Sequence, residues 1–362
     1  MCLDERQKLD FLLGAVSPTG FAGYFDQMLK LRSGWHSLLI KAGPGCGKST
    51  MMGKIAGHLT GQGETVELIH CSSDPDSLDG VVCSARKFSI VDATAPHSLE
   101  PKCPVAVETV VSLYDCIDEE AMREHQNEVF DLFGRCGVLQ ERAARYITAA
   151  GSLISDSARV AFAAANLPAA RSFAAHLALK YLPRTGASGE GSEELRILSA
   201  NTLKGPVCYR DTVAKVADTI VVLQDDWGAV SRAMMKVLRD AAVEKGYDVI
   251  TCYCPMAPHD KIDHLLIPSA KLAFVTSNRF HPMAFEHARV IHCTRFCDNE
   301  LLRAHRSRLR FNHKAAMDLF QQASKLQAEA KQNHDQLEEY YKAAADFPRI
   351  DEVTAAIIER YC

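Results

Sequence analysis

The sequence lacks any apolar run of the roughly 20 residues that a membrane-spanning helix requires. It also lacks an excess of positive charge, because 45 acidic residues outnumber 41 Lys and Arg and give a formal net charge of −4. Its first residues include several acidic ones and no signal-peptide pattern, so we expect neither export nor membrane anchoring. Aromatic residues make up only 7% of the chain. Together with the acidic balance, this argues against nucleic acid as a partner.

Paired cysteine motifs are also missing, although the chain contains 13 cysteines. The densest group is Cys252, Cys254, Cys293 and Cys297 with His292, and its spacing matches no paired CxxC zinc site. Cysteine is among the residues most often buried in proteins. We therefore expect buried, reduced thiols and a cytoplasmic location.

The sequence does contain an internal repeat. Residues 13–26 read LGAVSPTGFAGYFD and residues 198–211 read LSANTLKGPVCYRD, and the similarity continues at a nearly constant spacing. An ordered series of this kind, with both copies reading strand–turn–helix–strand–strand, predicts an ancient duplication. Matched pairs include Leu13–Leu198, Ala15–Ala200, Gly20–Gly205, Tyr24–Tyr209, Asp26–Asp211, Asp79–Asp263, Lys87–Lys271, Val91–Val275 and His97–His281.

The length of 362 residues fits two domains of ordinary size. We expect a first domain over residues 1–182, a Gly-, Ser- and Glu-containing linker over 183–195, and a second domain over 196–362. Helical insertions are expected at about 118–182, broken near Pro168, and at about 298–346. In the second insertion, apolar residues at three-four spacing predict an amphipathic helix or an antiparallel helical hairpin.

The most specific motif is AGPGCGKST over residues 42–50, which follows a candidate strand and precedes a helix-forming run. This is the Walker A pattern, with Ala42 at its first, usually glycine, position. Its glycines let backbone amides approach phosphate oxygens, and the helix N-terminus adds partial positive charge. Lys48 should bind the β- and γ-phosphates and Ser49 should ligate Mg²⁺. The expected nucleotide-binding residues are Gly43, Pro44, Gly45, Cys46, Gly47, Lys48, Ser49 and Thr50.

Cys46 lies within this string and close to the start of the expected helix. Thiolates are favoured at helix N-termini. We therefore predict an accessible Cys46 thiol whose alkylation is blocked by bound nucleotide.

A second acidic element should complete the site. Asp92 ends the mostly apolar run KFSIVD (87–92), which is typical of a Walker B strand that delivers a carboxylate to Mg²⁺. The next residue is Ala93, where many ATPases carry the Glu that activates water. Either hydrolysis is slow or the catalytic base lies elsewhere.

Candidates for that base are Asp74, Asp76 and Asp79 in CSSDPDSLDG (71–80). This segment follows a candidate strand over residues 65–70, so it should lie at the ligand-binding edge of the sheet. The same aspartates could instead stabilise turns around Pro75. His97 could sense the γ-phosphate, although a structural histidine is the simpler interpretation.

The second copy has lost the residues that bind phosphate. Its aligned segment is VLQDDWGAVSRAMMKVL (222–238), in which Ser231 faces Lys48, Arg232 faces Ser49 and Asp225 and Asp226 stand near the phosphate position. Thr276 replaces Asp92. We expect this copy to keep the fold without a triphosphate site, with Arg232 a weak substitute cation.

A basic run also follows the second copy. Arg303, Arg306, Arg308 and Arg310 lie on an expected helix, where a solvated face is the ordinary interpretation. A sharper hypothesis gives one of these arginines to a neighbouring γ-phosphate.

AGPGCGKST, HCSSDPDSLDG (70–80), DATAPH (92–97) and the duplication together resemble a bacterial family of tandem P-loop ATPase-like proteins. The resemblance implies an α/β fold with two P-loop NTPase-like domains, each a mainly parallel sheet flanked by helices, the second degenerate. It also implies nucleotide binding.

The motifs favour Mg²⁺-dependent binding and hydrolysis of ATP or GTP in the first domain. Lys48 and Asp92, with Asp74 or Asp79 as base, would be its catalytic residues. Two alternatives stay open: a small-molecule kinase, and a non-catalytic protein whose helical insertions dock a protein partner in response to nucleotide.

Overall fold

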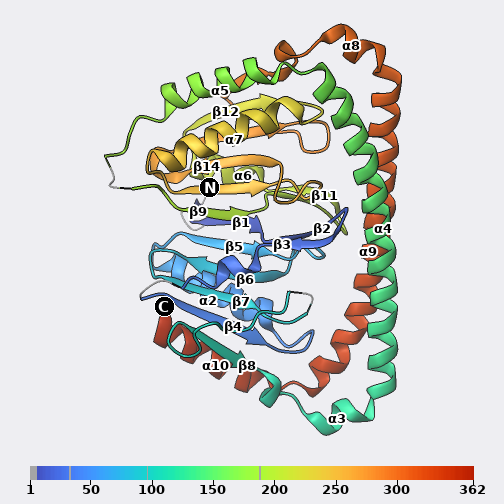
Figure 1. Cartoon of the computed structure of the whole chain (residues 1–362). Coiled ribbons are helices and arrows are strands. Elements are labelled where there is room, and N and C mark those ends of the chain that lie inside the picture. Colours follow the sequence, from blue (N-terminus) through green and yellow to red (C-terminus); the bar gives the residue numbers. More distant parts are fainter. Residues whose placement is uncertain (1–5, 32–33, 96, 187–188) are drawn as a thin grey trace.

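The computed structural model describes residues 6–31, 34–95, 97–186 and 189–362. It is an α/β structure with two six-stranded sheets and a pair of long helices along one side (Figure 1). Among the helices described, none combines the length and the apolar character that a bilayer crossing requires.

The first sheet has the strand order β1-β5-β6-β7-β4-β8. Only β6 runs antiparallel to its neighbours. Every residue of β7 is buried, as expected for a central strand covered on both faces. Helix α2 (Lys48–Gly61) packs against β5 and β6. The strands are β1 (Lys8–Leu12), β4 (His36–Lys41), β5 (Val66–His70), β6 (Leu78–Cys83), β7 (Phe88–Asp92) and β8 (Glu108–Ser112).

The second sheet repeats this arrangement in the order β9-β13-β14-β15-β12-β16, again with a single antiparallel strand, β14. Helix α7 (Ala229–Glu244) takes the place of α2. The two orders agree position by position, which is what an internal duplication predicts. The strands are β9 (Glu193–Arg196), β12 (Thr219–Gln224), β13 (Val249–Tyr253), β14 (Ile262–Ile267), β15 (Leu272–Ser277) and β16 (Arg289–His292).

The two sheets meet at their edge strands. Leu12, the last residue of β1, and Ile197, the residue after β9, exchange backbone hydrogen bonds of 2.8 and 2.9 Å. Beside this bridge Arg196 is fully buried, and it donates to Glu67 of the first sheet and to Glu194. A buried guanidinium needs such partners, so this ion pair fixes how the two halves meet. One core cluster extends across the junction, from Phe11 to Ile250.

Each half also carries a small hairpin that reaches the long helices. β2 (Gly14–Ser17) pairs with β3 (Gly20–Gly23) and contacts α4. β10 (Ser199–Thr202) pairs with β11 (Gly205–Cys208) and contacts α9. The short helices of the two halves are η1 (Phe25–Met28), η2 (Tyr114–Cys116), α3 (Glu119–Glu124), α6 (Arg210–Val216), η3 (Pro268–Ala270), η4 (Cys293–Phe296) and α8 (Asn299–Ala304).

The long helices α4 (Gln126–Ala164) and α9 (Arg306–Ala344) pack against each other, antiparallel, across both halves (Figure 1). Each has 39 residues, or about 60 Å at 1.5 Å per residue. Small residues such as Ala143, Ala150 and Ala323 are fully buried between them. The second insertion is therefore one continuous helix after the short α8. It forms no hairpin of its own.

The helices that follow are exchanged between the halves. α5 (Leu167–Tyr181) follows α4 and packs against α7 of the second half, while α10 (Phe347–Tyr361) follows α9 and packs against α2 of the first. A boundary at residue 182 therefore does not follow the packing, because α4 is long enough to carry α5 across. The expected linker ends early, since β9 begins at Glu193. Its residues 187–188 lie outside the described part of the chain.

Candidate functional site

The glycine-rich loop, residues 42–47, connects β4 to α2. Gly45 and Gly47 have φ angles of 69° and 76°, in the left-handed region that favours glycine. Gly47 is the N-cap of α2, and its carbonyl accepts the amide of Met51 at 2.8 Å. The helix thus begins at Lys48, and its N-terminal amides face the loop.

Lys48 lies at the centre of this loop. Its Nζ donates to the Gly43 carbonyl at 2.7 Å and lies 3.5 Å from Oδ2 of Asp92. β4 and β7 are parallel neighbours, and Ile40 near the end of β4 pairs with Asp92 at the end of β7. The loop that carries Lys48 and the side chain of Asp92 therefore lie at the same edge of the sheet. The other carboxylate oxygen of Asp92 accepts from the amide and hydroxyl of Thr94. The structure therefore brings Lys48 and Asp92 together.

The remaining loop residues differ in accessibility. Ser49 is partly buried, and its hydroxyl oxygen accepts the Leu78 amide at 3.0 Å, while Thr50 is exposed. Cys46 is only 1% exposed, and burial raises the pKa of its thiol. The prediction of an accessible, activated Cys46 is wrong, because the thiol packs beneath the loop and donates towards the Pro44 carbonyl.

Only one of the three candidate aspartates in CSSDPDSLDG is buried beside this pair. Asp79 immediately precedes Gly80, which pairs with Val91 of β7, and Asp92 follows Val91. The charge of Asp92 acts on the Asp79 carboxyl group. Burial, followed by the charge of Asp92, raises the pKa of Asp79 to about 7. A carboxyl group with this pKa exchanges its proton near neutral pH.

Asp74 and Asp76 have other partners. Asp74 accepts from the Asp76 amide and the Ser77 hydroxyl, which is the local turn bonding that favours Asp there, and it lies 3.5 Å from Lys331 of α9. Asp76 is exposed and pairs with Lys204 of the second half. Both residues therefore have structural roles in this conformation.

His97 lies against the ring of Phe25, with centroids 4.2 Å apart and the planes nearly parallel. Burial lowers the pKa of its imidazole, and the charge of Asp92 acts in the opposite direction. Its stacking partner gives it a packing role close to the charges of Asp92 and Lys48.

Helix α9 packs directly on the glycine-rich loop, a contact the sequence did not indicate. A methyl group on Gly43 would lie 2.4 Å from the ring of Tyr341, and one on Gly45 would lie 2.9 Å from the Glu338 carbonyl oxygen. Glycine at positions 43 and 45 therefore lets α9 pack closely against the loop. The signal is weak in sequence, because Glu338 and Tyr341 lie almost 300 residues from the loop.

In the second half, the loop between β12 and α7 is shorter. Helix α7 begins at Ala229, two residues before Ser231, the residue aligned with Lys48. Asp225 is 7% exposed, and its carboxylate accepts the amides of Trp227 and Gly228 at 3.2 and 3.0 Å and of Ser231 at 2.7 Å. The amides at the start of α7 are therefore bonded to the protein's own carboxylate.

The second half also has a buried ion pair at the position of Asp79 and Asp92. Asp263 occupies the position of Asp79, and Thr276 that of Asp92, with the Thr276 hydroxyl 3.3 Å from Oδ1 of Asp263. Lys261 donates to the same oxygen of Asp263. This ammonium group holds the pKa of Asp263 well below its usual range despite burial. Of the two aspartates in the first half, only Asp79 has an acidic counterpart, Asp263, and the buried Lys261 neutralises its charge.

Other repeated residues maintain the fold. Tyr24 packs on Tyr253 and His259 of the second half, and Tyr209 stacks on His70 of the first at 4.8 Å. Asp26 and Asp211 are exposed. Arg232 pairs with Asp260. Cys252, Cys254 and Cys293 are buried and Cys297 is partly buried, as predicted.

Comparisons with family models, with curated proteins and with solved structures found no match for this chain.

Proposed function

We propose that the first half of the chain binds ATP or GTP at the glycine-rich loop and hydrolyses it with Mg²⁺. The observation that carries the proposal is the meeting of Lys48 and Asp92, 3.5 Å apart, at the ends of two parallel strands and at the start of α2. Lysine, carboxylate and helix N-terminus in this order are the parts of a P-loop phosphate site.

Lys48 is the phosphate-binding cation in this account. Its amine is bonded to the Gly43 carbonyl, an acceptor that a phosphate oxygen can replace. An ionised acceptor makes a stronger hydrogen bond with an ammonium group than a carbonyl does. The amides that follow Gly45 and Gly47 supply further donors around the same ligand.

The carboxylates fit a divalent cation. Asp79 and Asp92 lie next to the paired residues Gly80 and Val91, and burial together with the charge of Asp92 raises the pKa of Asp79. Ser49 and Asp92 would hold Mg²⁺, and Ser49 keeps a free lone pair beyond its bond to the Leu78 amide. When bound, Mg²⁺ neutralises charge that develops on the phosphate oxygens.

Asp79 is the base that this arrangement favours. The position after Asp92 is the buried Ala93, which carries no titratable group. A carboxyl pKa of about 7 suits proton transfer at neutral pH. Asp79 would accept the proton of the attacking water, or of a substrate hydroxyl if the reaction is a phosphoryl transfer.

A nucleotide-gated interaction protein is the second candidate, and the packing of α9 on the loop favours it. Tyr341 and Glu338 contact Gly43 and Gly45, so a change of loop conformation on binding acts directly on a helix that spans both halves. In that case nucleotide would be bound without turnover and the surface of the α4–α9 pair would change.

Purified protein mixed with Mg-ATP or Mg-GTP distinguishes these functions. Thermal stabilisation together with phosphate release supports a hydrolase. Stabilisation without release supports the gated protein, or a kinase if release of ADP or GDP begins on addition of a metabolite pool. The absence of stabilisation by either nucleotide would contradict the proposal.

A further inference from the structure

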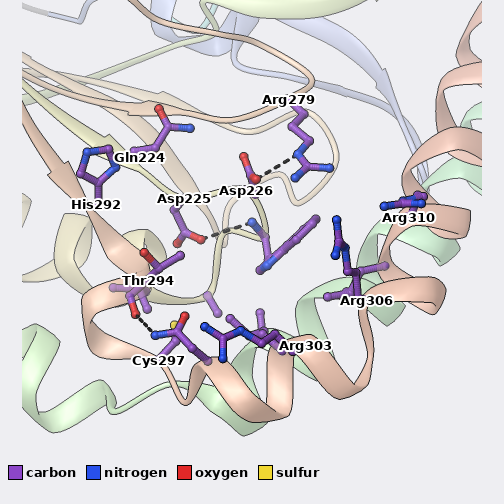
Figure 2. Close-up of a pocket in the computed structure, with 17 residues that line it drawn as sticks. Gln224, Asp225, Asp226, Arg279, His292, Thr294, Cys297, Arg303, Arg306 and Arg310 are labelled. Carbon is purple, nitrogen blue, oxygen red and sulfur yellow. Dashed lines mark hydrogen bonds and ion pairs between the residues drawn. The ribbon is translucent and has the colours of Figure 1, made fainter.

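The second half has a cavity of about 340 Å³ beside its shortened loop (Figure 2). The loop supplies Asp225, Asp226 and Trp227, and α8 and α9 form the opposite wall. This volume lies in the range of small-molecule sites. No part of the proposed nucleotide site contributes to it.

Three arginines on that wall lack a charged partner. Arg303, Arg306 and Arg310 line the cavity, and among the described residues none of them makes an ion pair or a side-chain hydrogen bond. Arg306 and Arg310 are one turn apart on α9 and so share a face. Arg308, between them, points elsewhere and pairs with Asp156 of α4.

The two aspartates of the cavity have hydrogen-bond and ion-pair partners other than these three arginines. Asp225 is bonded to the amides of Gly228 and Ser231. Asp226 pairs with Arg279 at 2.9 Å (Figure 2). Four arginines and two aspartates line the cavity, so its lining has an excess of two positive charges. A positive excess of this kind is the pattern expected around a phosphate or another multivalent anion.

The first half lacks this arrangement at the equivalent positions. The first and fifth residues of α9 are Arg306 and Arg310, whereas the same positions of α4 are Gln126 and Phe130. Arg123 of α3 corresponds to Arg303 but pairs with Glu119. Among the described residues, the unpaired arginines at these positions therefore belong to the second half and have no counterpart in the first.

We propose that this cavity binds a phosphorylated small molecule through the side chains of Arg303, Arg306 and Arg310. Trp227 lines the same cavity, and the guanidinium of Arg279 lies 5.3 Å from its ring. The indole offers a flat surface to the organic part of the ligand. Phosphate recognition here would use guanidinium groups, since the backbone amides of the loop are occupied by Asp225.

Tryptophan fluorescence tests the proposal, because the chain has only two tryptophans. Full-length Trp35→Phe protein leaves Trp227 as the reporter. It is titrated with pyrophosphate or with ADP, without Mg²⁺ and at constant ionic strength, and calorimetry provides a second readout. Both probes should bind saturably if the anion alone is recognised, and ADP should bind more tightly if the indole contributes.

Matched variants locate the binding. Arg306→Gln with Arg310→Gln should weaken the affinity at least about tenfold, since each charge-assisted hydrogen bond carries that much. Arg308→Gln removes the same charge from the same helix and should change the affinity by less than about threefold. Lys48→Ala should leave the Trp227 response unchanged, which separates this site from the proposed nucleotide site. Thermal melting checks that each variant is folded.

Three results would overturn the inference. Neither probe binds at millimolar concentration by either readout. The Arg308→Gln control loses as much affinity as the double variant. The signal and the heat disappear in Lys48→Ala, which would assign all anion binding to the first half.

Discussion

The carboxylate of Asp225 accepts the amide of Ser231 at 2.7 Å, and Ser231 aligns with Lys48 of the first half. In the second half, an internal carboxylate therefore accepts amides at the start of α7. In the first half, the start of α2 is formed by the glycine-rich loop and Lys48. Lys261 is likewise an internal partner, because its ammonium group pairs with the buried carboxylate of Asp263. In the second half, Asp225 and Lys261 thus supply an anion and a cation at the positions where the proposed site of the first half would hold a ligand and a metal ion.

Asp225→Ala should lower the free energy of unfolding by about 2 kcal/mol, because the buried amides of Gly228 and Ser231 lose their acceptor. Urea denaturation measures the change. Asp226→Ala is the control, since its partly exposed pair with Arg279 should contribute less than about 1 kcal/mol. Equal effects of the two substitutions would contradict the capping role.

Gly43→Ala should destabilise the protein by about 1–3 kcal/mol, because the added methyl group meets the ring of Tyr341 at 2.4 Å. In a protein that already carries Tyr341→Ala, the added Gly43→Ala substitution should lower the free energy of unfolding by much less. A double-mutant cycle by chemical denaturation checks this coupling.

Gly53→Ala provides the matched control, because no atom lies within 4 Å of its added methyl group on α2. It should stabilise the helix by up to about 1 kcal/mol. If the effects of Gly43→Ala and Tyr341→Ala on the free energy of unfolding are additive, Tyr341 of α9 does not pack against Gly43.

Asp79 should make stability fall as the pH rises. Its pKa is raised from 3.8 to about 7 in the folded protein, so the native state keeps a proton that the unfolded chain has already lost. The stabilisation is full below the unfolded pKa of 3.8 and is lost as pH rises to about 7.

Without Mg²⁺, Asp79→Asn should therefore reduce the loss of stability between pH 5 and pH 8 by about 2 kcal/mol. Urea denaturation of both proteins at the two pH values measures it. Asp76→Asn is the control, since that carboxylate is exposed and paired with Lys204. An unchanged pH dependence in Asp79→Asn would mean that Asp79 is ionised in the native state.

Local patterns predicted much of this structure. The glycine string placed the β4–α2 turn, and the apolar run before Asp92 placed β7, because both depend on neighbouring residues alone. The repeat predicted two similar α/β units, and the structure has two six-stranded sheets. The burial of most of the clustered cysteines also followed from composition.

Long-range packing was not predictable in the same way. Nothing in the periodicity of α4 or α9 tells that α5 and α10 are exchanged between the halves, because an amphipathic face does not specify its partner. The burial of Cys46 and the contact of Tyr341 with Gly43 depend on the same exchange. Nor did the sequence indicate that Arg306 and Arg310 of α9 line one cavity with residues of the loop that follows β12.

The affinity of Mg-ATP and Mg-GTP for Lys48→Ala, compared with Lys54→Ala, tests the central claim most directly. Both lysines lie on α2, but Lys54 makes an exposed pair with Asp351. Calorimetry should show nucleotide binding by the wild type and by Lys54→Ala, and a loss of at least about tenfold in affinity for Lys48→Ala. Equal affinity of the two variants, or no binding by the wild type, would contradict the account.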